Sequence, residues 1–128
     1  MNATLSLLGR IGLSLLFIIA GWGKLTAYAG TQQYMEAMGV PGALLPLTII
    51  LELGGGLAIA TGLYTRWVAI ALALFSVVTA LIFHSNFGDA MQATNFWKNI
   101  AVAGGFLTLA LQGAGAWSLD GLRHRALI

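Results

Sequence analysis

The sequence contains no cysteine, and this absence excludes several classes of redox protein. A chain without thiols cannot form a disulfide, run a thiol–disulfide relay, or hold an iron–sulfur cluster or a cysteine-based zinc site. The only histidines are His84 and His124, and no metal site is expected. Electrons, if the protein handles any, would have to pass between bound molecules or come from a partner.

Charged residues are also scarce, at 8% of the 128 residues, whereas hydrophobic residues make up 59%. A soluble domain carries about 25% charged residues, and the mean hydropathy of this chain is +0.87. The composition therefore predicts an integral membrane protein embedded in a lipid bilayer. The formal net charge is only +2 and no basic cluster is present, so nucleic acid is not an expected partner.

Four stretches are long and apolar enough to cross a bilayer as helices, which takes about 20 residues. They predict a single domain covering residues 1–128, with the all-α fold of a four-transmembrane-helix bundle. No basic residue precedes the first stretch, so we expect it to remain as a span rather than to be removed as a signal peptide. The expected spans are roughly 4–25, 43–62, 67–83 and 96–111.

The distribution of basic residues predicts the orientation, because cytoplasmic loops carry an excess of Lys and Arg. Four spans place both termini on the same side, and that side holds four arginines against two lysines on the other. We therefore expect both termini in the cytoplasm. His84 and His124 would then lie on opposite sides of the membrane, which argues against a haem held by both. The four arginines are Arg10, Arg66, Arg123 and Arg125, and the two lysines are Lys24 and Lys98.

Two polar segments, 26–42 and 84–95, connect the spans on the outer side. In the first, Thr31 is placed to cap a short helix from Gln32 to Met38, which Gly39 would end. Such a helix would lie in the membrane interface. The alternative is that the two segments form a lid over a site in the outer leaflet.

Glu52 stands near the middle of the second expected span. A carboxylate at this depth has to be neutral or paired, because a charged residue at a helix centre costs about 2.5–3.5 kcal/mol. Arg10, Lys24 and Lys98 are the candidate partners. Arginine stays charged and forms bidentate pairs, so we expect Glu52 and Arg10 to form the buried charge pair. This pair would either hold the bundle together or belong to a proton-handling or ligand site.

A second group of polar and aromatic residues is expected at one level near the outer ends of the spans. Most of its members are hydrogen-bond donors around an apolar mouth, which suits a carbonyl-bearing or anionic ligand such as a quinone headgroup. The alternative is ordinary anchoring, in which lysines extend to the interface and the tryptophan lies in the aromatic belt. The candidate ligand-binding residues are Lys24, His84, Asn95, Trp97, Lys98 and Asn99.

Three motifs resemble the DoxX family of small bacterial inner-membrane proteins: LLGRIGLSLLFIIAGWGKL, LELGGGLAIATGLYTR and NFWKNIAVAGG. The resemblance extends from about Leu7 to Gly105, and its clearest markers are Gly21 to Lys24 and Glu52 to Gly55. It implies four membrane helices and a location in the inner membrane. Related DoxD-type proteins are membrane subunits of a thiosulfate:quinone oxidoreductase, and other relatives are linked to quinone or sulfur stress.

Two functional hypotheses follow from these observations. In the first, the chain is a quinone- or sulfur-linked redox component of the membrane, or the membrane anchor of such an enzyme, with quinone as the expected cofactor and a separate redox subunit as partner. In the second, it is a non-enzymatic scaffold or a transporter of small solutes or lipids. The glycine-rich spans would also permit a homodimer. Whether the chain is itself an enzyme stays open.

Overall fold

The computed structural model describes residues 2–122, and most of them are helical. The all-α fold predicted from composition and hydropathy is confirmed. The elements in chain order are α1 (Asn2–Thr26), α2 (Tyr28–Ala37), the 3₁₀ turn η1 (Gly42–Leu44), α3 (Leu45–Ile49), the π-helical turn η2 (Ile50–Gly54), α4 (Gly55–Thr61), α5 (Thr65–Phe83) and α6 (Ala90–Gln112).

Three helical segments have the length and hydropathy of membrane spans, and they match the first three predicted stretches. They are α1, the continuous run Gly42–Thr61, and α5. The fourth predicted stretch lies within α6, a long helix that packs along α5. Helix α6 begins at Ala90, six residues before the predicted start, because the side chain of Asp89 accepts a hydrogen bond from the Met91 N–H and caps the helix there.

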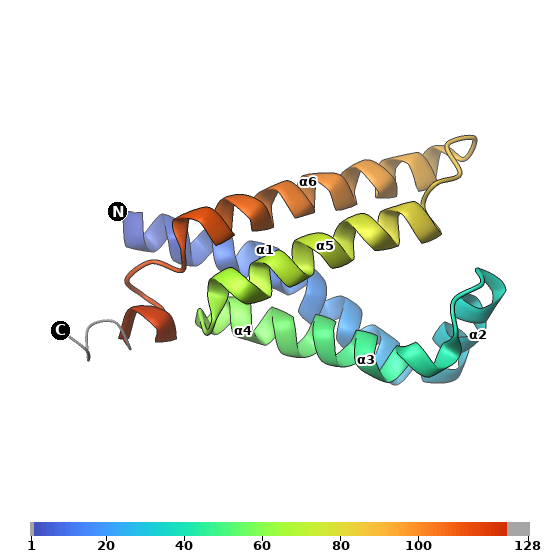
Figure 1. Cartoon of the computed structure of the whole chain (residues 1–128), viewed down its shortest axis with the longest axis horizontal. Coiled ribbons are helices and arrows are strands. Elements are labelled where there is room, and N and C mark those ends of the chain that lie inside the picture. Colours follow the sequence, from blue (N-terminus) through green and yellow to red (C-terminus); the bar gives the residue numbers. More distant parts are fainter. Residues whose placement is uncertain (1, 123–128) are drawn as a thin grey trace.

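The helices form two pairs that diverge from one end of the molecule (Figure 1). Helices α5 and α6 lie side by side, while α1 packs against the run from α3 to α4. The two pairs are held together by an apolar core in which Phe17 of α1 contacts Phe106 of α6, with ring centroids 5.4 Å apart. Toward α2 the pairs separate, and this separation produces the cavity described below.

Helix α1 approaches the second span very closely at Gly21. A Cβ atom at this position would lie 2.9 Å from the backbone nitrogen of Leu53, so only glycine fits. On the second span, Gly56 lies one turn after Leu53, and it is equally close to Ile18 of α1. Small residues allow such close contacts between membrane helices. Gly54 and Gly104, by contrast, are exposed and have no neighbour at the Cβ position.

The chain after α6 folds back onto the end where α1 begins. Gly62, in the left-handed region with φ 74°, accepts a hydrogen bond from the Asp120 N–H at 2.8 Å. The carboxylate of Asp120 accepts hydrogen bonds from the N–H groups of Tyr64 and Thr65, both at 2.8 Å. Asp120 therefore satisfies the free N–H groups at the start of α5. Arg123 and Arg125, on which the predicted orientation partly depends, lie outside the described residues, as does His124.

The predicted helix in the first outer connection is present but starts earlier than expected. Helix α2 begins at Tyr28, almost continuous with α1, and Thr31 does not cap it. Instead, the Thr31 hydroxyl donates a hydrogen bond to the Ala27 carbonyl one turn earlier, as is usual for a threonine inside a helix. The sequence pattern missed the first turn because Ala27, the residue before it, has no side chain that could cap a helix.

Candidate functional site

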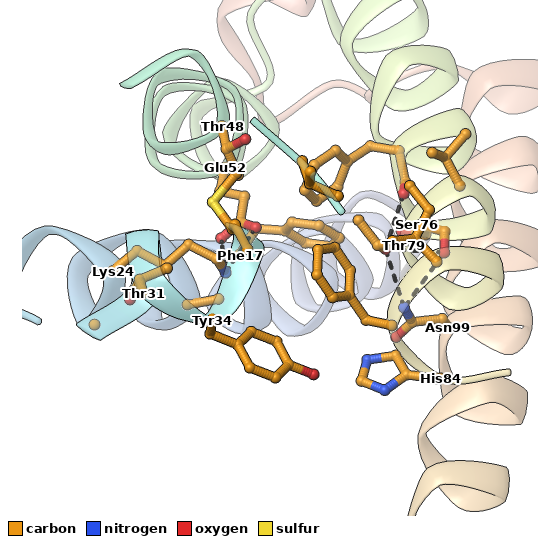
Figure 2. A pocket seen from close by; sticks show the side chains of 18 of the residues that line it. Phe17, Lys24, Thr31, Tyr34, Thr48, Glu52, Ser76, Thr79, His84 and Asn99 are labelled. Carbon is orange, nitrogen blue, oxygen red and sulfur yellow. Dashed lines mark hydrogen bonds and ion pairs between the residues drawn. The ribbon is translucent and has the colours of Figure 1, made fainter. Parts of the chain in front are cut away.

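A cavity of about 740 Å³ lies between the two helix pairs, at the end of the molecule where they diverge. One wall comes from α1, α2 and the second span, and the opposite wall comes from α5 and α6. The lining is mostly apolar, with three phenylalanine rings, and polar groups occur at two places on opposite walls (Figure 2). The rings are those of Phe17, Phe75 and Phe83.

Lys24 and Glu52 form an ion pair on the first wall. The Lys24 Nζ atom lies 2.9 Å from both carboxylate oxygens of Glu52. The Glu52 side chain is 4% exposed, whereas that of Lys24 is 30% exposed. Glu52 lies in the π-helical turn η2, and such turns are frequent at functional sites. The pair removes the isolated charge that would otherwise be costly inside the membrane.

The expected pairing of Glu52 with Arg10 is therefore wrong. Arg10 and Lys24 are fourteen residues apart on α1, which is about 21 Å along a helix, so only one of them can reach Glu52. The close contact of Gly21 with Leu53 places the second span in register with the Lys24 end of α1. Hydropathy gives the depth of each residue only approximately and cannot set this register.

Arg10 has a different role at the other end of the bundle. Its side chain is 1% exposed, and its Nη1 atom donates hydrogen bonds to the carbonyls of Ile59 at 3.1 Å and Ala60 at 2.9 Å. Its Nη2 atom donates to the Trp117 carbonyl. Arg10 thus joins α1, the end of α4 and the chain that follows α6, and its contribution is structural.

Three more of the predicted ligand residues line the same cavity from the opposite wall: His84, Lys98 and Asn99. The Asn99 amide nitrogen donates to the Ser76 carbonyl at 3.3 Å and to the Thr79 hydroxyl at 3.2 Å. The His84 Nδ1 atom lies 2.7 Å from Gln92 Oε1. These three residues and Lys24 were expected at one level near the outer ends of the spans. The structure places all four around the same cavity.

The other two predicted ligand residues, Asn95 and Trp97, are not among the residues that line the cavity. Trp97 is 60% exposed, and its ring packs edge-on against Phe96 with centroids 5.0 Å apart. This arrangement fits the aromatic anchor that was the alternative interpretation. Because α6 starts at Ala90, Lys98 and Asn99 lie two turns inside the helix and not in its first turn.

Helix α2 closes one side of the cavity. Tyr34 and Met35 both line it, and Met35 is buried against Leu45 and Ile49. The Tyr34 ring stacks on Phe83 of α5, with centroids 5.5 Å apart, and so connects the two helix pairs. The polar segment 26–42 thus borders the cavity, which is part of what the lid interpretation requires.

The sequence pattern missed several residues of the site. Ser76 and Thr79 read as ordinary span residues, yet they hold the Asn99 amide. Their spacing of three residues on one helix face was the available signal. Gln92 could not be found, because its contact with His84 depends on how the connection between α5 and α6 folds.

The fold and the site together define a small, multi-pass helical membrane protein with an ion pair exposed to an internal cavity. The chain belongs to the DoxX family, whose model matches residues 5–85. The resemblance found in the motifs is therefore confirmed.

Two relatives from Escherichia coli strain K12 support this assignment. Inner membrane protein YqjF is 56% identical over 119 residues, covering 93% of this chain and 92% of that protein. Inner membrane protein YphA is 39% identical over 123 residues, covering 91% of this chain and 88% of that protein. No solved structure matches the chain. These relatives indicate that the chain is an integral protein of the inner membrane.

Proposed function

We propose that the protein binds a lipid-soluble ring of the quinone class in its cavity and serves as a membrane component of a quinone-linked redox process. One observation carries the proposal: a space of about 740 Å³ with aromatic walls that ends in polar groups. Ligand sites have this character, in which apolar walls supply affinity and a few polar groups fix orientation.

The charges of the cavity favour an uncharged ring over a sulfur oxyanion. Lys24 is already neutralised by Glu52, whose carboxylate would repel an anion placed beside it. Lys98 also lines the cavity, but its side chain is exposed. An exposed ammonium group is well solvated and attracts an anion only weakly.

The redox part of the proposal requires a second molecule. The sequence has no cysteine, so electrons would pass between bound molecules or to a partner subunit for which this chain is the membrane anchor. We further propose that both termini face the cytoplasm, as the count of basic residues favours. The cavity then lies on the periplasmic side, because it is at the opposite end from the start of α1.

A binding measurement with two matched variants tests the proposal. Gly23 and Gly12 both have open space at the Cβ position. Gly23 lines the cavity, and Gly12 lies outside it. The purified protein in nanodiscs should bind decylubiquinone or decylubiquinol above the partition into empty nanodiscs. Gly23→Phe should reduce this binding about tenfold or more, because the ring occupies ligand space, and Gly12→Phe should leave it unchanged. Absence of binding to the wild type, or an equal loss in both variants, would contradict the proposal.

A second candidate function is transport of a small solute coupled to protons. The Lys24–Glu52 pair favours it, since ionisable residues inside a membrane often mark a transport path. In proteoliposomes, a pH-dependent flux that Glu52→Gln abolishes, together with no binding of quinone or quinol, would replace the first function with this one. If neither binding nor flux is observed, the result favours the hypothesis of a non-enzymatic scaffold.

A further inference from the structure

Four of the five hydroxyl groups that line the cavity already use their hydrogens within the protein, the fifth being that of Tyr34. Each of these four donates to the carbonyl four residues earlier on its own helix, at 2.8–3.0 Å. A hydroxyl oxygen that has donated its hydrogen keeps lone pairs and can only accept. The side chains concerned are those of Thr31, Thr48, Ser76 and Thr79.

The Asn99 amide is fixed in one orientation. Its nitrogen lies 3.3 Å from the Ser76 carbonyl oxygen, which can only accept a hydrogen bond. The Oδ1 atom is therefore the group that Asn99 offers to a ligand, and within residues 2–122 it has no hydrogen-bond partner. In Figure 2 the amide nitrogen points toward Ser76 and Thr79, and the oxygen points toward His84.

His84 likewise offers an acceptor. Its Nδ1 atom lies 2.7 Å from Gln92 Oε1, which accepts, so the neutral ring carries its hydrogen on Nδ1. The Nε2 atom of the neutral ring is then an acceptor, and it has no hydrogen-bond partner among the described residues. Figure 2 shows the Tyr34 hydroxyl pointing toward the same ring. Lys24 is held by Glu52 on the opposite wall, and Lys98, which also lines the cavity, is exposed.

We propose that the His84–Asn99 end of the cavity binds a hydroxyl group, so that the preferred ligand is a phenol or hydroquinone rather than a quinone. This inference rests on the proposed function and specifies its ligand. A hydroxyl donates its hydrogen to Asn99 Oδ1 or His84 Nε2. A quinone carbonyl in the same place has no hydrogen to donate, and its oxygen lone pairs would face those of the two acceptors. The phenyl rings of Phe17, Phe75 and Phe83 contact the rest of the ring. The site thus differs from the donor-rich site that the residue types alone suggested.

Three ligands with the same trimethylated ring distinguish hydroxyl from carbonyl recognition. We would titrate the full chain, in nanodiscs of phosphatidylethanolamine and phosphatidylglycerol under anaerobic conditions, with trimethylhydroquinone, its dimethyl ether and trimethylbenzoquinone. Calorimetry with empty nanodiscs as reference gives each affinity. The hydroquinone should bind about 3- to 10-fold more tightly than the other two, the effect of one or two hydrogen bonds.

Variants locate the preference. Asn99→Leu and His84→Phe should each reduce the preference for the hydroquinone, because each removes one acceptor. Thr94→Ala, at an exposed site on the same helix, should preserve it. The wild-type comparison decides the matter even if a variant fails to fold. Equal affinities, or tighter quinone binding, would overturn this inference while leaving ring binding intact. Binding of none of the three would overturn the proposed function as well.

Discussion

Lys24 on α1 and Glu52 in η2 are joined by two contacts of 2.9 Å at the edge of the cavity. Removing either partner leaves the other charge without its counterion in a nonpolar environment. We expect Glu52→Gln and Lys24→Met each to lower the free energy of unfolding by about 1–3 kcal/mol, less than for a fully buried pair because Lys24 is partly exposed. Thermal unfolding in detergent measures the loss.

The double variant is the informative control for this pair. If the pair is the main interaction of both residues, Lys24→Met combined with Glu52→Gln should lose less than the sum of the single losses. Glu36→Gln, which changes an exposed carboxylate on α2, should have little effect. Strictly additive losses would contradict a direct pairing.

Arg10 should be essential for stability and not for ligand binding. Its guanidinium group supplies hydrogens to three carbonyls from two segments. We expect Arg10→Met to cost about 2–3 kcal/mol and Arg10→Lys to cost less, because lysine keeps the charge but lacks the planar fork. Arg66→Met, at an exposed site, should stay within about 0.5 kcal/mol of the wild type. An Arg10→Met protein that is as stable as the wild type but binds no ligand would show that this assignment is wrong.

Asp120 should hold the segment after α6 in place. The carboxylate accepts hydrogen bonds from two N–H groups at the start of α5, and loss of such a cap costs about 0.5–2 kcal/mol. In Asp120→Ala, backbone amides in residues 114–122 should exchange hydrogen faster than in the wild type. Asp120→Asn, which retains one acceptor oxygen, should give an intermediate rate. Unchanged exchange in Asp120→Ala would mean that other contacts hold this segment.

Two glycines on α1 distinguish the effect of close helix packing from the effect of replacing any glycine in a helix. A methyl group at Gly21 would lie 2.9 Å from the Leu53 nitrogen, whereas one at Gly12 would meet nothing within 4 Å. Gly21→Ala should therefore destabilise the fold by about 1–3 kcal/mol. Gly12→Ala should be neutral or slightly stabilising, because alanine favours helix more than glycine does. The melting temperatures of the two variants provide the comparison, and equal values would argue against the close contact between α1 and η2.

The features that could be predicted from the sequence are those that depend on composition and hydropathy. They include the all-α membrane fold and three spans to within a few residues, because an apolar helix of fixed length is what a bilayer requires. The need of Glu52 for a partner was also predictable. Four of the six predicted ligand residues line one cavity because they stand at neighbouring span ends.

The remaining features depend on register and on irregular backbone, which hydropathy does not encode. The choice between Arg10 and Lys24 follows from the contact at Gly21. The hydrogen-bonding role of Asn99 depends on Ser76 and Thr79 of the facing helix, so the residue type alone suggested a donor where the structure presents an acceptor. The return of Asp120 to the start of α5 involves residues about 55 positions apart and has no local signal.

Photo-crosslinking with an azido-quinone, followed by peptide mass spectrometry, tests most directly whether the cavity is the ligand site. We predict labelling of cavity residues on both walls, such as Phe17, Met35 and Phe75, and protection of these residues by excess trimethylhydroquinone. Labelling confined to exposed residues of the outer helix faces, such as Leu74 and Leu107, without protection, would contradict the account.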